Sequence, residues 1–332
     1  VLYWLGRIHY VLSKPQTAIE YAKQSLEIAE RLGDDALAAP SVNLMGRLYW
    51  QVSDFPNSSQ MLARSVDQMC RLGNKSEEAT AAGFAGEVFA FMGQFSTAFA
   101  YAERGIQVAR EIHNPFAEAA TNQYRGFVRD QHGDWAQAIN DYENARRIAE
   151  SAGDIFRVYI VKYYEGQACT MGGDPARGRV LLEESLDLAA KIGTKFGLAY
   201  QKAYLAGSLL ALGELNGVPP LCEEAIPLAE EAGDKWIKAL ALRTLAQAVS
   251  RLDPSNRQDA ERADLEAIQI QREIGAQAEL GRTYVSYARL LRAWREAERA
   301  RETLTQAIGM FQEMGMAWDL SQAESALRDL SA

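Results

Sequence analysis

The sequence predicts an all-α protein, a right-handed α-solenoid of about eight helix-turn-helix repeats that ends in a C-terminal capping helix. When the 332 residues are written in rows of 40, one column holds only glycine or alanine, a second is almost entirely glycine, and a third holds only small residues. No stretch of useful length alternates polar and apolar residues with the period of a β-strand. Hydrophobic residues make up 48% of the chain, which is enough for a packed core.

The first column places a small residue in the first helix of every repeat. A small residue there lets the backbone of one helix approach another closely, because a larger side chain would hold the two axes apart. The third column does the same for the second helix of each repeat. The first column reads Gly6, Gly46, Gly86, Gly126, Gly166, Ala206, Ala246 and, after a two-residue insertion, Ala288. The third reads Ser25, Ser65, Gly105, Ala145, Ser185, Ala225, Ala267 and Ala307.

The second column marks where helices end. It reads Gly33, Gly73, His113, Gly153, Gly193, Gly233, Gly275 and Gly315. These residues follow segments with helical periodicity, where a left-handed C-terminal cap is expected. A turn such as Gly133-Asp134-Trp135 separates the two helices within a row. Each row is therefore predicted to be helix, turn, helix, turn.

We expect a single superhelix over residues 1–332, with about 17 helices, in which each helix pair touches only its neighbours. The predicted repeats are 1–33, 34–73, 74–113, 114–153, 154–193, 194–233, 234–275 and 276–315, followed by a cap at 316–332. The cap resembles one more first helix, but Arg328 occupies the column that requires a small residue, so no further repeat can pack there. The short segment before Gly6 predicts an open N-terminal face and an array cut from a longer polypeptide.

Composition excludes several classes of partner. The net charge of −9 and the pI near 5.1 disfavour a nucleic-acid grip and an anionic membrane surface. The apolar opening segment is interrupted by Arg7 and resembles neither a signal peptide nor a membrane span. Three cysteines, Cys70, Cys169 and Cys222, are widely scattered, so we expect free thiols in a cytoplasmic protein.

Two rows identify a family resemblance. Leu44-Met45-Gly46-Arg47-Leu48-Tyr49 and residues 135–145 are similar to the Leu-Gly-x-x-Tyr and Ala-x-x-x-Tyr-x-x-Ala spacings of the tetratricopeptide repeat. The period is 40 rather than 34 residues, so each helix should gain most of a turn. Such long repeats resemble the sensor arms of maltose-activator-like regulators and of bacterial signalling ATPases joined to nucleotide cyclases. The resemblance implies a module that binds a partner.

No catalytic signature supports an enzyme. The chain has no Gly-x-Gly-x-x-Gly, phosphate loop, His-Glu-x-x-His or Cys-x-x-Cys motif. The three histidines, His9, His113 and His132, fall at different repeat positions, where structural roles are the simplest interpretation. We therefore expect a non-catalytic protein with no cofactor and no metal site.

The resemblance implies a ligand groove lined by the first helices, at positions three before, one after and four after the small-residue column. Aromatic, amide and guanidinium side chains, which dominate binding hot spots, occur at these positions. The alternative is a concave surface that is merely compatible with water. The candidate groove residues are Tyr3, Arg7, Asn43, Arg47, Trp50, Gln123, Phe127, Tyr163, Gln167 and Arg243.

Polar residues also interrupt packing columns in the fourth and fifth repeats. Arg125 and Glu165 stand where earlier rows have apolar residues, and Arg129 replaces an aromatic or apolar residue. Buried polar groups must be paired or face a hollow. Two hypotheses remain open: an Arg125–Glu165 ion pair that only stabilises the stack, or a polar pocket in which Arg125 and Arg129 hold an anionic group.

The leading functional hypothesis is the recognition arm of a larger signalling or regulatory protein, binding a peptide, a protein segment or a small ligand in its groove. Other domains of the parent protein are further candidate partners, whereas nucleic acid and membrane are not. The alternative is a scaffold or oligomerisation module without a groove ligand. A phosphate-loop ATPase or cyclase domain upstream would favour the first hypothesis.

Overall fold

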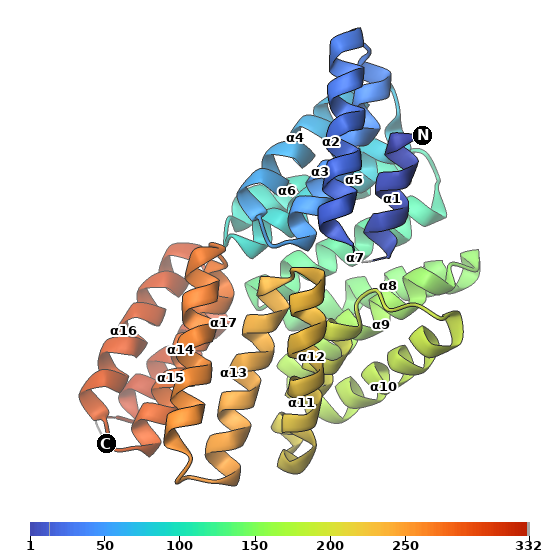
Figure 1. Cartoon of the computed structure of the whole chain (residues 1–332). Coiled ribbons are helices and arrows are strands. Elements are labelled where there is room, and N and C mark those ends of the chain that lie inside the picture. Colours follow the sequence, from blue (N-terminus) through green and yellow to red (C-terminus); the bar gives the residue numbers. More distant parts are fainter. Residues whose placement is uncertain (13, 331–332) are drawn as a thin grey trace.

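A computed structural model describes residues 1–12 and 14–330 and shows an all-α solenoid (Figure 1). Within these residues the chain forms 17 α-helices, one short 3-10 helix (Leu215–Gly217) and no strand, as predicted. The helices are α1 (Leu2–Val11), α2 (Pro15–Leu32), α3 (Asp35–Gln51), α4 (Phe55–Arg71), α5 (Lys75–Phe91), α6 (Phe95–Glu111), α7 (Pro115–His132), α8 (Trp135–Ala152), α9 (Ile155–Met171), α10 (Pro175–Ile192), α11 (Leu198–Leu212), α12 (Val218–Ala232), α13 (Lys235–Leu252), α14 (Arg257–Glu273), α15 (Gln277–Ala293), α16 (Ala297–Met314) and α17 (Ala317–Arg328).

Local sequence fixes where the helices begin and end. Several first helices start after an Asp or Asn whose side chain accepts a backbone N–H, as Asp154 does from Arg157 at 2.9 Å. The predicted capping column adopts left-handed backbone throughout, and even His113, which replaces a glycine there, has a φ of 50°. The predicted helix ends are therefore confirmed.

The small-residue columns lie where helices cross closely. A Cβ atom added to Gly126 would stand 2.7 Å from Cε1 of Tyr142 on α8. A Cβ atom on Gly105 would stand 2.8 Å from the carbonyl oxygen of Ala79 on α5. Distances this short leave no room for a side chain, so the close approach predicted from the columns is confirmed.

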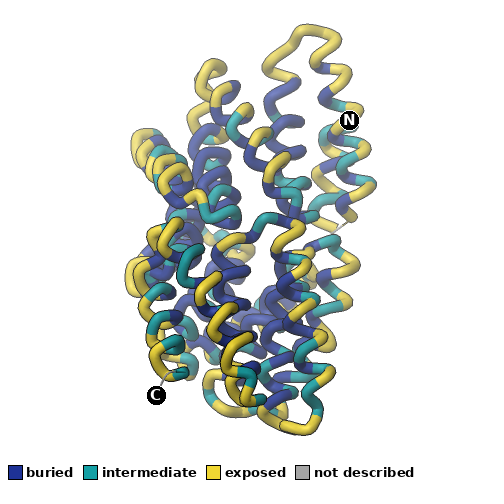
Figure 2. The backbone as a smooth tube through the Cα atoms, turned by 90° about the vertical axis from the view of Figure 1, so that its left-hand side faces the viewer, coloured by how far each residue is buried: buried dark blue, intermediate teal, exposed yellow. Residues whose placement is uncertain are grey.

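The odd-numbered helices form an inner layer, and the even-numbered helices pack outside them. Successive first helices contact one another, as α5 contacts α7 and α11 contacts α13. In Figure 2 the inward-facing helices are mostly buried, the loops are exposed, and the outer helices alternate between buried and exposed positions. The C-terminal helix α17 packs on α15 and α16, and Arg328 on it is exposed, as a capping helix requires.

Contacts between distant repeats contradict the expectation that each pair touches only its neighbours. Trp236 at the start of α13 packs edge-on against Phe91 at the end of α5, with ring centroids 5.0 Å apart. The Ser53 hydroxyl donates to Asp234 at 3.4 Å. Trp135 on α8 meets Trp318 on α17 at 5.6 Å. The superhelix twists tightly enough to bring the turns of the early repeats onto the later repeats.

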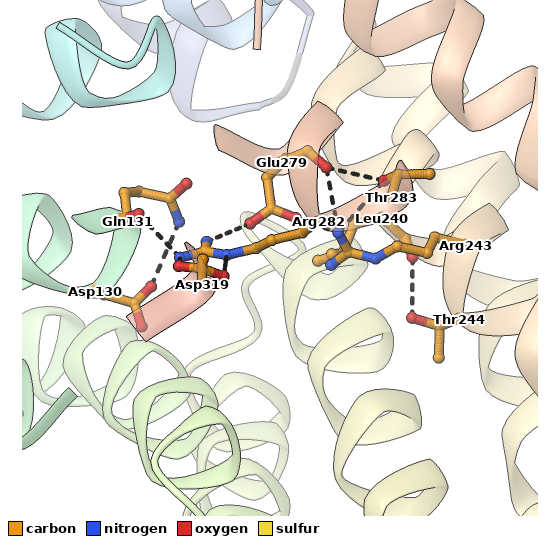
Figure 3. A network of polar contacts seen from close by, with 9 residues as sticks. All are labelled: Asp130, Gln131, Leu240, Arg243, Thr244, Glu279, Arg282, Thr283 and Asp319. Atoms are coloured by element: carbon orange, nitrogen blue, oxygen red, sulfur yellow. Dashed lines mark hydrogen bonds and ion pairs between the residues drawn. The ribbon is translucent and has the colours of Figure 1, made fainter. Parts of the chain in front are cut away.

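A buried ionic network joins α7 to the C-terminal helices α13, α15 and α17 (Figure 3). Arg282 on α15 makes a bidentate pair with Asp319 at 2.9 and 3.0 Å and also pairs with Glu279 at 2.7 Å. Its guanidinium donates a further hydrogen bond to the carbonyl of Gln131 at the end of α7, at 2.9 Å. Arg243 on α13 binds the other oxygen of Glu279 at 2.7 Å. Helix α7 from the middle of the chain therefore meets α13, α15 and α17 at one charged cluster.

Three further features concern membrane spans, metal-binding groups and cysteines. No helix within the described part of the chain is both long and apolar enough to cross a membrane. Residues 1–12 and 14–330 hold no group of three or more His, Cys, Asp or Glu side chains arranged to bind a metal ion. All three cysteines are free, with Cys70 exposed and the other two buried.

Candidate functional site

A hollow of about 340 Å³ lies on the inner face of the N-terminal repeats. Its walls come from α1, α3, α5, α7 and α9, and Phe196 closes one side from the loop that precedes α11. Seven of the candidate residues from the sequence line it. We call this hollow the N-terminal groove. The seven residues are Tyr3, Arg7, Asn43, Arg47, Trp50, Gln123 and Tyr163.

Arg47 stands in this groove without an acidic partner. Its Nε donates to Oδ1 of Asn43 at 2.8 Å, and its guanidinium lies 4.6 Å from the centre of the Phe84 ring. One Nη reaches the Tyr124 hydroxyl at 3.5 Å. Among the described residues no carboxylate lies within ion-pair distance of Arg47. Its charge is therefore oriented but not neutralised.

Arg157 on α9 reaches the same groove from the opposite wall. It donates to Oε1 of Gln123 at 2.5 Å and lies 5.8 Å from the Tyr124 ring. Its Nε is buried without a hydrogen-bond partner in the described chain. Burial would raise the pKa of Tyr124, but the charges of Arg47 and Arg157 outweigh it and lower that pKa. The two guanidiniums thus act on one shared space.

The acidic side chains of the groove do not balance its arginines. Glu87 is 1% exposed, and burial raises its pKa to about 8 despite the opposing charges of Arg47 and Arg157. At neutral pH this carboxyl group is therefore mostly protonated. Glu77 is the other acidic residue in the lining, against three arginines with Arg7 included. In a chain of net charge −9 this groove is a local positive site.

Aromatic rings complete the walls. Trp50 meets Phe84 at 5.3 Å, and Phe84 meets Tyr124 at 5.4 Å, both edge to face. On the other side Phe196 lies 5.9 Å from Tyr10. Rigid aromatic walls with a few polar groups are typical of ligand sites. The groove can therefore hold an anionic group beside an apolar one.

The central polar cluster differs from both sequence hypotheses. Arg125 pairs with Asp141 at 2.7 Å and with Glu103 at 3.1 Å, so the proposed Arg125–Glu165 pair is wrong. Arg129 also binds Asp141, at 2.7 Å, and Asp141 is fully buried. The structure gives no support to a pocket in which Arg125 and Arg129 hold an anion, because their partners Glu103 and Asp141 lie on the outer helices α6 and α8.

The other four candidate residues from the sequence lie outside the N-terminal groove. Glu165 is fully buried and pairs with Arg146 at 2.9 Å and Arg177 at 2.7 Å. Phe127 is fully buried against Phe91 at 4.7 Å and does not line the groove. Gln167 and Arg243 line a second hollow nearer the C-terminus.

Sequence reasoning missed Phe84, Tyr124 and Arg157 as groove residues. The first two belong to a column two residues before the small-residue column, which continues with Tyr164 and Tyr204. This aromatic repetition was available as a signal. Arg157 lies near the start of α9, at a position that the column rule does not cover, and nothing in its local sequence marks it.

Comparison with solved structures finds the same fold at low identity. A Rap protein complexed with Competence and Sporulation Factor gives a TM-score of 0.64 at 13% identity, covering 99% of this chain and 95% of that chain. NprR in complex with its cognate peptide NprX gives 0.62 at 13%, covering 85% and 82%. Aspartyl phosphate phosphatase F from Bacillus subtilis gives 0.60 at 12%, covering 86% and 74%. The chain thus has an all-helical repeat fold shared with these proteins.

Comparison of the sequence itself gives nothing further, since no family model matches it and no curated protein matches it.

Proposed function

We propose that this chain is a non-catalytic recognition module that binds a peptide or protein segment in the N-terminal groove. The observation that carries the proposal is the pair Arg47 and Arg157, which share one aromatic-walled hollow and have no carboxylate partner among the described residues. Such a site suits a carboxylate next to an apolar side chain. The recognised segment therefore has an acidic side chain or a free C-terminus beside an aromatic or aliphatic residue.

The structural neighbours support a peptide as the ligand. Two of them were solved with Competence and Sporulation Factor and with the peptide NprX. Their identity to this chain is 13%, so they indicate a class of ligand and not a particular sequence. The long repeat and the acidic surface fit the sensor arm of a larger cytoplasmic signalling protein.

A peptide array tests the proposal. Short synthetic peptides that vary an acidic residue, an aromatic residue and the terminal carboxylate are screened against the protein, and hits are titrated by calorimetry. Arg47→Met and Arg157→Met should each weaken binding by roughly tenfold or more, because a hydrogen bond to a charged group contributes about 1.5 to 3 kcal/mol. Arg110→Met, at an exposed position on α6, is the matched control and should change nothing.

Two results would overturn the proposal. One is a peptide whose affinity is unchanged by both groove substitutions. The other is an array with no preference for acidic over neutral peptides, since the unneutralised guanidiniums of Arg47 and Arg157 would then not select the ligand.

A second candidate is a scaffold, favoured by the apolar outer side of α1. Trp4 is 60% exposed and Ile8 54% exposed on this helix. Apolar side chains gathered on one exposed helix often mark a contact surface. Analytical ultracentrifugation distinguishes this function, because self-association abolished by Trp4→Gln and Ile8→Gln, with no peptide binding, would favour it.

A further inference from the structure

A second hollow, also of about 340 Å³, lies between α9, α11, α13, α15 and α17. Tyr163, Tyr200 and Trp236 stand about one helical turn before its lining residues on α9, α11 and α13, and the Tyr200 ring lies 5.9 Å from each of the other two. Gln167 on α9, Leu240 on α13 and Trp318 on α17 are among its lining residues. We call it the C-terminal pocket. It shares no lining residue with the N-terminal groove.

The pocket owes its width mainly to small side chains on α11, which also contributes Leu210 to the lining. Ala203, Gly207 and Ala211 line its floor at successive turns of this helix. A Cβ atom added to Gly207 would meet no atom within 4 Å, so this glycine is not required by helix packing. Neighbouring repeats carry Gln167 and Gln247 at the equivalent position. The missing side chain leaves a space of ligand size.

The pocket carries positive charge that the protein does not neutralise. Two of its arginines, Arg243 and Arg282, belong to the ionic network with Glu279 and Asp319 drawn in Figure 3. Arg289, an exposed residue about two helical turns after Arg282 on α15, makes no hydrogen bond or ion pair with any described residue. The charge of the network is therefore balanced, and Arg289 adds an unpaired one.

Arg251, also an exposed residue, is a further unneutralised charge at the pocket wall. Its Nη1 donates to the carbonyl oxygen of Leu210 at 3.2 Å, and no carboxylate among the described residues lies within ion-pair distance. Desolvation by the pocket walls, followed by repulsion from Arg243, lowers the pKa of Arg289, although part of this residue is exposed to solvent. Like charges held together in a hollow favour an anion between them.

A buried hydroxyl group points to the same ligand. Ser286 is 3% exposed and lines the pocket one turn before Arg289 on α15. Its Oγ has no hydrogen-bond partner within the described chain. Buried polar groups are nearly always satisfied, so an unpaired hydroxyl in a hollow indicates a missing acceptor. Trp318, 41% exposed at the rim, offers an aromatic face to the rest of the ligand.

We propose that the C-terminal pocket binds a small organic anion, with its carboxylate or phosphate group held by Arg289, Arg251 and Ser286 and its flat body against Trp318. Guanidinium groups bind both kinds of oxyanion in bidentate geometry, and a serine hydroxyl adds a donor. The pocket volume suits a molecule of one or two rings. This site is separate from the peptide groove, and each can be present without the other.

Calorimetry with defined probes tests the proposal. Phenyl phosphate, benzoate and inorganic phosphate are titrated into the full chain, with benzamide as the neutral comparison. At least one of the two organic anions should bind, and benzamide should not. The stronger of phenyl phosphate and benzoate identifies the oxyanion, whereas inorganic phosphate alone should bind more weakly because it lacks the part that packs on Trp318.

Variants locate the binding site. Arg289→Gln should weaken the organic anion at least about tenfold, the factor expected for one lost charge-assisted hydrogen bond. Ser286→Ala should weaken it less. Arg262→Gln, at a position whose side chain is 73% exposed, is the control for loss of charge and should have no effect. Arg47→Met should also leave this binding unchanged, because it alters only the N-terminal groove.

Three outcomes overturn the proposal. The first is that none of the anions binds at millimolar concentration. The second is that binding persists unchanged in Arg289→Gln. The third is that the anions bind to the unsubstituted chain but Arg47→Met abolishes their binding. A peptide that requires Arg289 and competes with the organic anion would instead extend the peptide groove into this pocket and replace the small molecule as its ligand. Failure of the peptide array does not affect these measurements, so the two proposals can fail separately.

Discussion

Replacing Arg282 with Met should cost about 3 to 5 kcal/mol of folding free energy, the penalty measured when one partner of a buried ion pair is removed. Arg282 is 8% exposed, and its guanidinium holds both oxygens of Asp319, one oxygen of Glu279 and the carbonyl of Gln131. Glu279 retains Arg243 after the substitution. Asp319, 4% exposed, keeps no ion-pair partner among the described residues. The cost therefore falls mainly on Asp319.

Urea unfolding followed by far-ultraviolet circular dichroism measures this loss. Arg64→Met is the control, because the Arg64–Glu30 pair has both side chains more than 40% exposed and should contribute about 0 to 1 kcal/mol. The double variant with Arg282→Met and Asp319→Leu should recover part of the loss, since no buried carboxylate is then orphaned. A loss of stability for Arg282→Met as small as that for Arg64→Met would refute the conclusion that this network holds the C-terminal helices against α7.

Three further predictions test the packing, the central cluster and a buried carboxyl group. Gly126→Leu should lower stability by about 1 to 3 kcal/mol or more, because the added Cβ atom would already stand 2.7 Å from the Tyr142 ring; an unchanged melting temperature would contradict this. Arg129→Ala should lower stability by weakening the pairing of buried Asp141, and should leave peptide affinity unchanged. Glu87 has a folded pKa of about 8 against an ordinary 4.5, so it binds its proton more tightly in the folded chain. Its contribution to stability is full below about pH 4.5 and is lost as pH rises through 8, and Glu87→Gln should flatten this decline in urea midpoints measured across that range.

The sequence predicted the parts of the fold that repeat locally. Helix ends follow from left-handed glycines such as Gly153, and helix crossings follow from the small column, because both depend on residues close together in the chain. The contacts between distant repeats could not be predicted this way. They depend on a small rotation per repeat that accumulates over several repeats, so the contact of Trp236 with Phe91 has no local signature.

The candidate site was predicted only in part, because helical spacing shows which residues share a face of one helix but not which residues of the next helix face them. Three groove positions per first helix lie on one face of a helix, so the rule found Arg47 and Gln123 together. Arg125 and Arg129 lie about 200° around α7 from Gln123 and Phe127, since each residue turns the helix by about 100°. The sequence showed that these arginines were unusual in a packing column. Only the structure showed that Asp141 on the next helix faces them.

The ionic network around Arg282 can align the contacting repeats more narrowly than apolar contacts alone. Aromatic pairs such as Phe91 with Trp236 form over a range of centroid separations, about 4.5 to 7 Å. The bidentate pair of Arg282 and Asp319 requires one alignment of two forked groups, and the additional bond to Gln131 fixes that alignment relative to α7. A buried ion pair is a weak source of net stability but can set register. The network therefore fixes α13, α15 and α17, three of the helices that line the C-terminal pocket, in one arrangement relative to α7.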